Sequence, residues 1–189
     1  MAHVSVGVDP GLRSPAIAVV VGGAVVRAVT LRIGSSVRGA ERLSLIREKA
    51  SRVLSDYPGA QAAAIEGPSL ASTHREYDLG EASGVLRQLI YEIYALESLV
   101  VPPTSLKKYA TGNGGAGKDL MIQYAVRELG ARIGDDEDDA ADAAALAHLA
   151  HAFISSLPPS TRHAAEVLKQ LRQPSIVRRR RTKPGTLSI

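Results

Sequence analysis

The sequence contains no cysteine and no tryptophan, and only 4% of its residues are aromatic. Without cysteine, disulfides, thiol catalysis and cysteine-ligated zinc are excluded, which fits a reducing cytoplasm. Long apolar runs are also lacking, since the run Ala16–Val21 is far too short to span a bilayer. No signal-type cleavage site follows Met1. We therefore expect a soluble cytoplasmic protein with no membrane partner.

The charges that are present have an uneven distribution. Among 189 residues the net charge is +4, but six of the 19 acidic residues lie between positions 135 and 142. Elsewhere, 23 basic residues stand against 13 acidic ones. A basic body with one acidic focus suits a polyanion that is bound broadly and processed with metal at one point. The alternative is a soluble basic domain with a solvated acidic turn.

Apolar periodicity predicts a mixed α/β domain. A hydrophobic content of 45% is enough for a substantial core. The expected strands are 3–8, 16–21, 24–31, 62–65 and 98–101, and the expected helices are 41–57, 77–96, 119–129, 139–153 and 163–171. This order predicts a five-stranded sheet flanked by helices, with an antiparallel hairpin at its edge and parallel central strands. Active sites of such sheets lie at the carboxyl ends of the strands.

Four acidic residues are placed where such a fold could bring them to one point. Asp9 and Glu66 each end an apolar strand before a turn containing proline and glycine. Asp139 and Asp142 are spaced i, i+3 and share one helix face. Each has an ordinary explanation: a turn for Asp9, a loop cap for Glu66 and the helix dipole for Asp139. Together they favour a metal-dependent nuclease, in which carboxylates hold two divalent ions against a phosphodiester.

Five segments of the chain occur in the order of a known family. They are Gly7-Val8-Asp9-Pro10-Gly11, Ala64-Ile65-Glu66, residues 79–85, a basic stretch with Lys107, Gly112, Gly114 and Lys118, and Asp139-Ala140-Ala141-Asp142-Ala143. From about residue 4 to about residue 152, the chain resembles RuvC-type Holliday junction resolvases of the ribonuclease-H-like superfamily. The resemblance implies a ribonuclease-H-like fold in a bacterial or phage-infected cell.

The resemblance also implies roles for individual residues. Asp9, Glu66, Asp139 and Asp142 would bind Mg²⁺ or Mn²⁺, two ions per active site. Lys107 and Lys118 would lie near the scissile phosphate, where a lysine could neutralise charge developing in the transition state. We place Lys118 in the catalytic set, while Lys107 could equally be a surface contact to the DNA backbone. The expected enzyme is a homodimer that nicks four-way junctions symmetrically.

The chain departs from the family in the loop that follows Glu66. That loop carries no aromatic residue before Tyr77, whereas the family has an aromatic wedge there. We expect Leu70 to serve as an apolar wedge and Arg75 to contact DNA. The departure leaves two alternatives open: a debranching endonuclease that cuts flaps and forks, or a branched-DNA-binding scaffold without catalysis.

Two further segments complete the expectations. We divide the chain into a nuclease domain, 1–157, and an extension, 158–189, with a basic tail that we expect to be disordered. In that tail Arg178, Arg179, Arg180 and Arg181 would bind phosphates. Residues 112–118 almost spell a phosphate-binding P-loop, but Asp119 replaces the required Ser/Thr and the preceding segment looks helical. We therefore expect no nucleotide cofactor.

Overall fold

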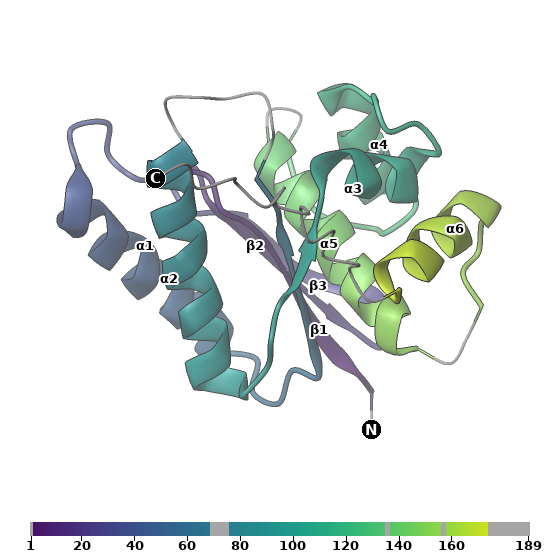
Figure 1. Ribbon diagram of the computed structural model, residues 1–189, viewed down its shortest axis with the longest axis horizontal. Coiled ribbons are helices and arrows are strands. Elements are labelled where there is room, and N and C mark those ends of the chain that lie inside the picture. Colours follow the sequence, from purple (N-terminus) through teal and green to yellow (C-terminus); the bar gives the residue numbers. More distant parts are fainter. Residues whose placement is uncertain (1, 69–75, 135–136, 156–157, 174–189) are drawn as a thin grey trace, which may run out of the picture.

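A five-stranded mixed sheet forms the centre of the molecule (Figure 1). The computed structural model describes residues 2–68, 76–134, 137–155 and 158–173. The strands are β1 (Val4–Asp9), β2 (Ala16–Val21), β3 (Ala24–Thr30), β4 (Ala62–Glu66) and β5 (Leu99–Val101), and they lie side by side in the order β3-β2-β1-β4-β5. Strands β1, β2 and β3 form an antiparallel meander, whereas β1, β4 and β5 are parallel. The predicted α/β class and sheet pattern are confirmed.

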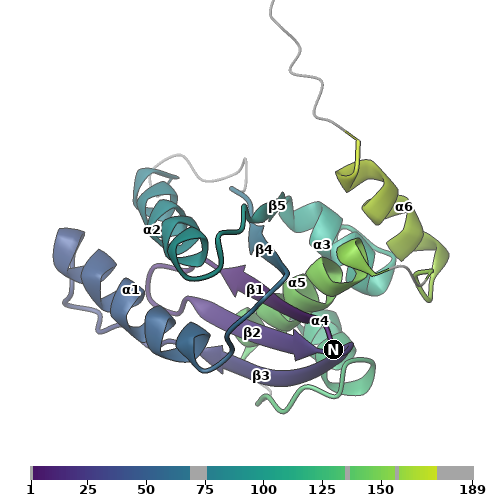
Figure 2. The same cartoon turned by 90° about the horizontal axis from the view of Figure 1, so that it is seen from below.

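Helices cover both faces of this sheet (Figure 2). One face packs against α1 (Gly39–Ser55) and α2 (Glu76–Tyr94), and its cluster contains Val6 and Val8 of β1. On the other face lies α5 (Asp138–Ile154), accompanied by α3 (Pro103–Thr111), α4 (Lys118–Arg127) and α6 (Arg162–Leu171). No helix in the described part of the chain is both long and apolar enough to cross a membrane.

Helix α5 lies directly on β1 because both elements present small residues to each other. Its buried face consists mainly of alanines, from Ala140 to Ala150. On the strand, Gly7 leaves no room for a side chain: a Cβ there would lie 2.2 Å from both the carbonyl oxygen of Ala143 and the amide nitrogen of Ala147. Next to it, the Ser5 hydroxyl donates a hydrogen bond of 2.9 Å to the Ala147 carbonyl. This close approach sets the position of the helix that carries Asp139 and Asp142.

The boundaries of the elements agree with the sequence pattern to within a few residues. The turn between β2 and β3 is formed by Gly22 and Gly23, both with positive φ, as the hairpin prediction requires. The segment before the glycine-rich loop is helical, as expected, although α3 already begins at Pro103. Proline is well suited to the first turn of a helix because it has no amide hydrogen to leave unpaired.

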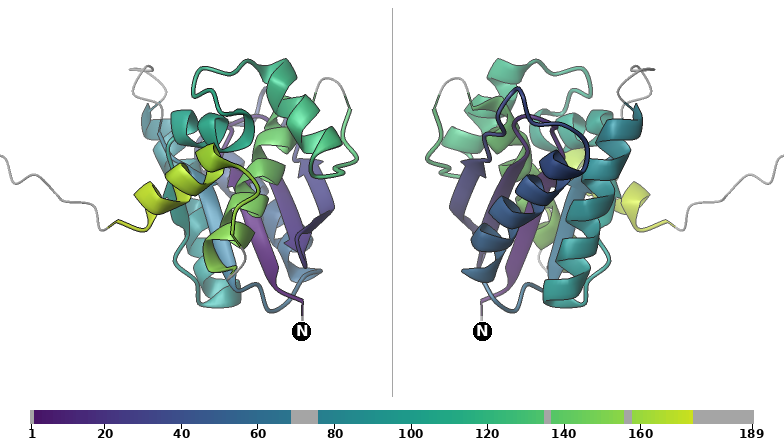
Figure 3. Two further views of the ribbon diagram at one scale, coloured as in Figure 1. Left: turned by 90° about the vertical axis from the view of Figure 1, so that its right-hand side faces the viewer. Right: turned by 90° about the vertical axis from the view of Figure 1, so that its left-hand side faces the viewer.

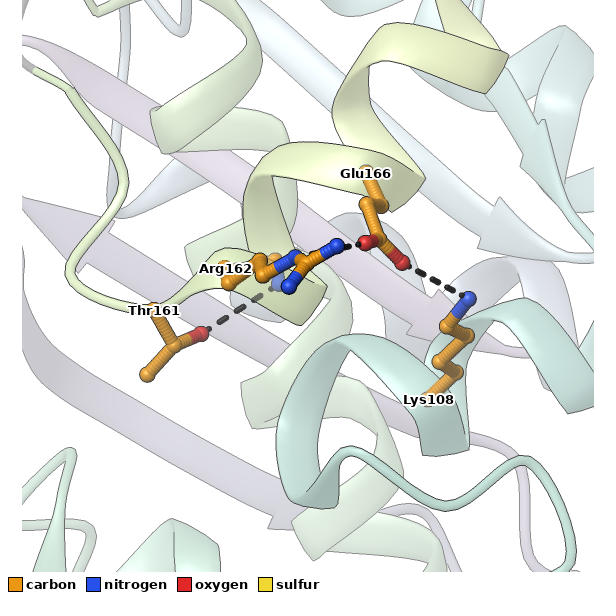
Figure 4. A network of polar contacts seen from close by, with 5 residues as sticks. Lys108, Thr161, Arg162 and Glu166 are labelled. Atoms are coloured by element: carbon orange, nitrogen blue, oxygen red, sulfur yellow. Dashed lines mark hydrogen bonds and ion pairs between the residues drawn. The ribbon is translucent and has the colours of Figure 1, made fainter.

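The C-terminal extension begins with a helix that shares the core of the body. Ala164, Val167 and Leu168 of α6 are buried in the cluster that includes residues of α3 and α5. At the surface of this contact, Lys108 of α3 forms a 3.1 Å ion pair with Glu166 (Figure 4). The Thr161 side chain caps the first turn of α6 by accepting a hydrogen bond from the Ala164 amide. The basic residues Arg178–181 lie outside the described residues.

Candidate active site

The carboxylates of Asp9 and Glu66 are neighbours at one edge of the sheet. Strands β1 and β4 are adjacent and parallel, with Val8 opposite Ile65, so the residues that follow lie side by side. Asp9 pairs with Ala16 across the hairpin, and Ala16 packs in the cluster on the α5 side. Because paired residues point to the same face of a sheet, the Asp9 side chain is directed towards α5. The side chains of Val8 and Asp9 therefore point to opposite faces of the sheet.

Asp139 and Asp142 face this edge from the beginning of α5. Their influence is seen in the pKa of Asp9, whose side chain is buried. Burial raises that pKa well above its usual value, and the charges of Glu66, Asp139 and Asp142 raise it further. Such mutual effects place the four carboxylates within range of one another's charge. The structure therefore brings together all four acids singled out in the sequence.

Burial and neighbouring charges also raise the pKa values of Glu66 and Asp142. Burial, followed by the charge of Asp142, raises the pKa of Glu66 to about 7. Burial also raises the pKa of Asp142 to about 6, with contributions from Asp138 and Asp139. One oxygen of Asp142, Oδ1, is buried without a hydrogen-bond partner in the described structure. Unpaired buried oxygens and repelling charges are the condition that a bound cation relieves.

The donor set fits a hard divalent cation. Carboxylate oxygens are preferred by Mg²⁺ and Mn²⁺, and no histidine among the described residues contributes to the raised pKa values of Asp9, Glu66 and Asp142. Across the described residues, no three acidic or histidine side chains are arranged closely enough to hold an ion as they stand. The carboxylates lie within range of one another's charge, and they would have to come closer together to share an ion.

Two lysines border the acidic group in different ways. Lys107, from α3, lowers the pKa of both Glu66 and Asp142, which places its ammonium group within reach of the carboxylates. Lys118, at the start of α4, forms a 2.5 Å ion pair with Asp138 and is 77% exposed. Asp138 is not among the acids that the sequence singled out as metal ligands. Its role as the partner of Lys118 could not be seen from spacing, because 20 residues separate the two.

A cleft of about 300 Å³ opens beside Asp9 and Glu66. One wall consists of Gly67 and Pro68, and the opposite wall is the face of α2 formed by Leu79, Gly80, Ser83, Gly84 and Arg87. No atom of the described residues lies within 4 Å of a Cβ built on Gly80 or Gly84. As far as the described part of the chain goes, this face of α2 is therefore uncovered.

A larger cavity, of about 720 Å³, lies near the far end of α5. It is lined by the rings of Tyr109, Tyr124 and His148, and Glu128 is its only acidic lining residue among those described. The Tyr109 hydroxyl and His148 Nδ1 are 2.9 Å apart. Its described lining offers three histidines but only one carboxylate, so the cleft beside Asp9 and Glu66 is the better candidate for binding Mg²⁺ or Mn²⁺ despite its smaller volume.

Some of the sequence predictions fall on parts of the chain that are not described. Leu70, Arg75 and Arg178–181 lie outside the described residues. Conversely, the sequence reasoning missed Gly7 and Ser5, which position α5. The signal for Gly7 was a glycine inside a strand otherwise rich in valine, since such a glycine often marks a close approach of another backbone.

Comparisons with known proteins agree with this fold. The family model described as "Crossover junction endodeoxyribonuclease RuvC" matches residues 5–151. A RuvC structure from Thermus thermophilus has a TM-score of 0.64 at 21% identity, covering 77% of this chain and 91% of that chain. A structure of T. thermophilus RuvC with a Holliday junction substrate has a TM-score of 0.66 at the same identity and coverage. Among curated proteins, the sequence has no significant match. Helix α6 lies beyond the matched segment.

Proposed function

The chain belongs to the RuvC family of crossover junction endodeoxyribonucleases, which depend on divalent metal ions. On that premise we propose a role for each active-site residue in the cleavage of a Holliday junction. The observation that carries the proposal is the meeting of carboxylates from β1, β4 and α5 at one sheet edge. Asp9, Glu66, Asp139 and Asp142 would hold two Mg²⁺ or Mn²⁺ ions. When bound, these ions supply an activated water and stabilise the charge of the departing oxygen.

In this proposal Asp9 positions the acidic group, and Lys107 supplies a positive charge beside it. Asp9 is the most buried of the four acids and is fixed by the β1 ladder, so it defines the point around which the other carboxylates gather. Lys107 is near both Glu66 and Asp142. We propose that its ammonium group neutralises negative charge on the phosphate during cleavage.

Lys118 has a different part in this proposal. Its exposed ammonium group is paired with Asp138, which belongs to the same acidic helix start. A DNA phosphate bound at the start of α5 would compete with Asp138 for this lysine, so that Lys118 contacts the substrate near the cleavage point. Since Lys118 is largely exposed, it can exchange Asp138 for a phosphate at little cost.

We propose that the enzyme acts as a homodimer through α2. Tyr77, Gly80, Gly84, Arg87 and Tyr91 recur at intervals of three and four residues and form one stripe along this helix. Tyr77 and Tyr91 are 87% and 57% exposed, and the glycines between them leave open space. Small residues flanked by exposed aromatics allow two helices to approach closely about a two-fold axis. A two-fold dimer would place two active sites on a four-way junction for paired cuts.

The composition of the loop after Glu66 favours a second candidate. No aromatic residue occurs between Gly67 and Glu76, so the wedge that would restrict cleavage to junctions is absent or is supplied by Leu70. A broader debranching endonuclease, acting on flaps and forks as well, is the alternative. Location in the cytoplasm of a bacterial or phage-infected cell likewise stays a proposal.

Cleavage of matched DNA shapes tests the two candidates. A labelled mobile four-way junction, a flap and a linear duplex of the same sequence are incubated with Mg²⁺ or Mn²⁺. We expect paired, symmetric nicks in the junction, with 5′-phosphate ends that ligase reseals, and little cutting of the other shapes. Equal cutting of flaps would favour the debranching enzyme, and binding of the junction without cutting in either metal would contradict both.

A further inference from the structure

Two arginines lie at the active-site edge of the sheet, on the side away from Lys107. Arg13 is in the connection between β1 and β2, and Arg32 follows the end of β3. Helix α3, which carries Lys107, packs near Val101 of β5 at the other side of the sheet. The connection that leaves β3 runs across the end of the molecule opposite the N-terminus, where β1 ends (Figure 3).

Backbone hydrogen bonds hold the two arginine segments together. The ladder of β2 and β3 continues past their ends: the Leu31 amide donates to the Pro15 carbonyl at 2.7 Å, and the Ile33 amide donates to the Arg13 carbonyl at 2.8 Å. Both segments are therefore fixed with respect to the sheet. Neighbouring strands lie about 4.8 Å apart. Because β3 is two strands from β1, Arg32 leaves the sheet roughly 10 Å from Asp9.

The direction of Arg32 follows from its neighbours. Leu31 and Ile33 are buried in the cluster beneath α1 and α2. In an extended segment, the residue between them points to the opposite face. Arg32 is therefore exposed on the face of the sheet towards which Asp9 points.

Both arginines are exposed and lack an ion-pair partner in the described part of the chain. The charges that shift the pKa values of Asp9, Glu66 and Asp142 are other acids and lysines, not these arginines. An arginine whose backbone is fixed near such a site, and which has no counter-ion in the described part of the chain, is available for a phosphate.

We propose that Arg13 and Arg32 bind the backbone phosphates of the DNA strand that leads away from the cleavage point across the ends of β2 and β3. This inference rests on the proposed function and adds a second basic border opposite Lys107. Successive base pairs rise about 3.4 Å along duplex DNA, so a separation of roughly 10 Å corresponds to about three nucleotides. The acidic centre would then lie between two sets of cations that guide one strand over it.

The salt dependence of junction binding tests this border. Arg13→Gln, Arg32→Gln and the double variant are compared with wild type by fluorescence anisotropy in Ca²⁺, without cleavage. The matched control is Arg27→Gln. Arg27 is an exposed arginine of β3, and the next residue, Ala28, packs on the α5 face. Arg27 therefore points to the opposite face of the sheet, away from the face to which Asp9 and Arg32 point. Each phosphate contact contributes about 0.9 to the slope of log K against log salt. We expect the double variant to lose about 1.8 of that slope and to bind about 30-fold more weakly at 0.15 M salt, that is, about fivefold per arginine.

The outcomes separate this inference from the function itself. An unchanged slope in the double variant, with wild-type protein binding the junction normally, would overturn the proposed border. An equal loss in Arg27→Gln would also overturn it, since the effect would then be one of net charge alone. Failure of wild-type protein to bind or cut junctions would instead count against the proposed function.

Discussion

Alanine at position 7 would place a methyl group within the backbone of α5. The new Cβ would lie 2.2 Å from atoms of both Ala143 and Ala147, whereas ordinary contacts begin near 3.4 Å. Since these atoms belong to the helix backbone, no rotamer change relieves the overlap. Helix α5 must therefore move away from β1 by roughly 1 Å. We expect Gly7→Ala to cost about 1–3 kcal/mol of unfolding free energy, as overpacked cores do.

The same displacement should reduce activity in the folded fraction. Asp139 and Asp142 belong to α5 and would move with it, whereas Asp9 belongs to β1 and would not. The distance between these carboxylates would therefore increase. A misplacement of about 1 Å lowers a catalytic rate by about 100-fold. Urea unfolding and single-turnover junction cleavage, performed below the unfolding transition, measure the two effects separately.

A matched glycine variant provides the control. At Gly34, an added Cβ would meet only a Val37 methyl at 3.4 Å, which is an ordinary contact. Gly34→Ala should therefore leave both stability and cleavage close to wild type. If Gly7→Ala were as stable and as active as Gly34→Ala, the close approach of α5 to β1 would not position the acids, and the reasoning would be refuted.

Three other predictions follow from the same geometry. Without metal, the folded state holds protons that the unfolded chain has released, because the pKa of Glu66 is raised to about 7 and that of Asp142 to about 6. Stability should therefore fall as pH rises from about 4 to about 7, and Mg²⁺ should raise the melting temperature at pH 8; a flat, metal-independent profile would contradict this. Gly84→Ala should stabilise the isolated helix by up to about 1 kcal/mol but weaken dimerisation, which sedimentation equilibrium would measure; an unchanged dimer constant would argue against the α2 interface. Leu168→Ala should cost about 2–5 kcal/mol in urea unfolding, whereas Glu166→Gln should change the midpoint little because its ion pair is solvent-screened; similar losses in both would show that the ion pair, rather than the buried face, holds α6.

The fold could be predicted because its signals are local. Alternating valines define β1, and the Gly22-Gly23 pair defines the hairpin. The acids were predictable for the same reason: Asp9 and Glu66 end their strands, and parallel neighbouring strands bring their carboxyl ends together. The i, i+3 spacing of Asp139 and Asp142 requires only helix geometry.

The features that escaped prediction depend on partners distant in sequence. Gly7 matters because of Ala143 and Ala147, which are about 140 residues away, and a single glycine does not reveal which backbone approaches it. The pairing of Lys118 with Asp138 and the docking of α6 onto α3 are likewise tertiary. An amphipathic pattern shows that a helix has a face to bury, but it does not identify the surface that receives it.

The central claim is that carboxylates from β1, β4 and α5 form one metal-dependent cleavage centre. Its most direct test is single-turnover cleavage of a four-way junction in Mn²⁺ by wild type, Asp9→Asn and Asp119→Asn, with junction binding measured in parallel. Asp119 is a matched control, because it is an exposed acid in the first turn of α4 that does not contribute to the raised pKa values of the centre. We predict that Asp9→Asn binds the junction but cuts at least about 1000-fold more slowly, while Asp119→Asn cuts at the wild-type rate. Cleavage by Asp9→Asn at the wild-type rate, or wild-type cleavage that persists in EDTA, would contradict the account.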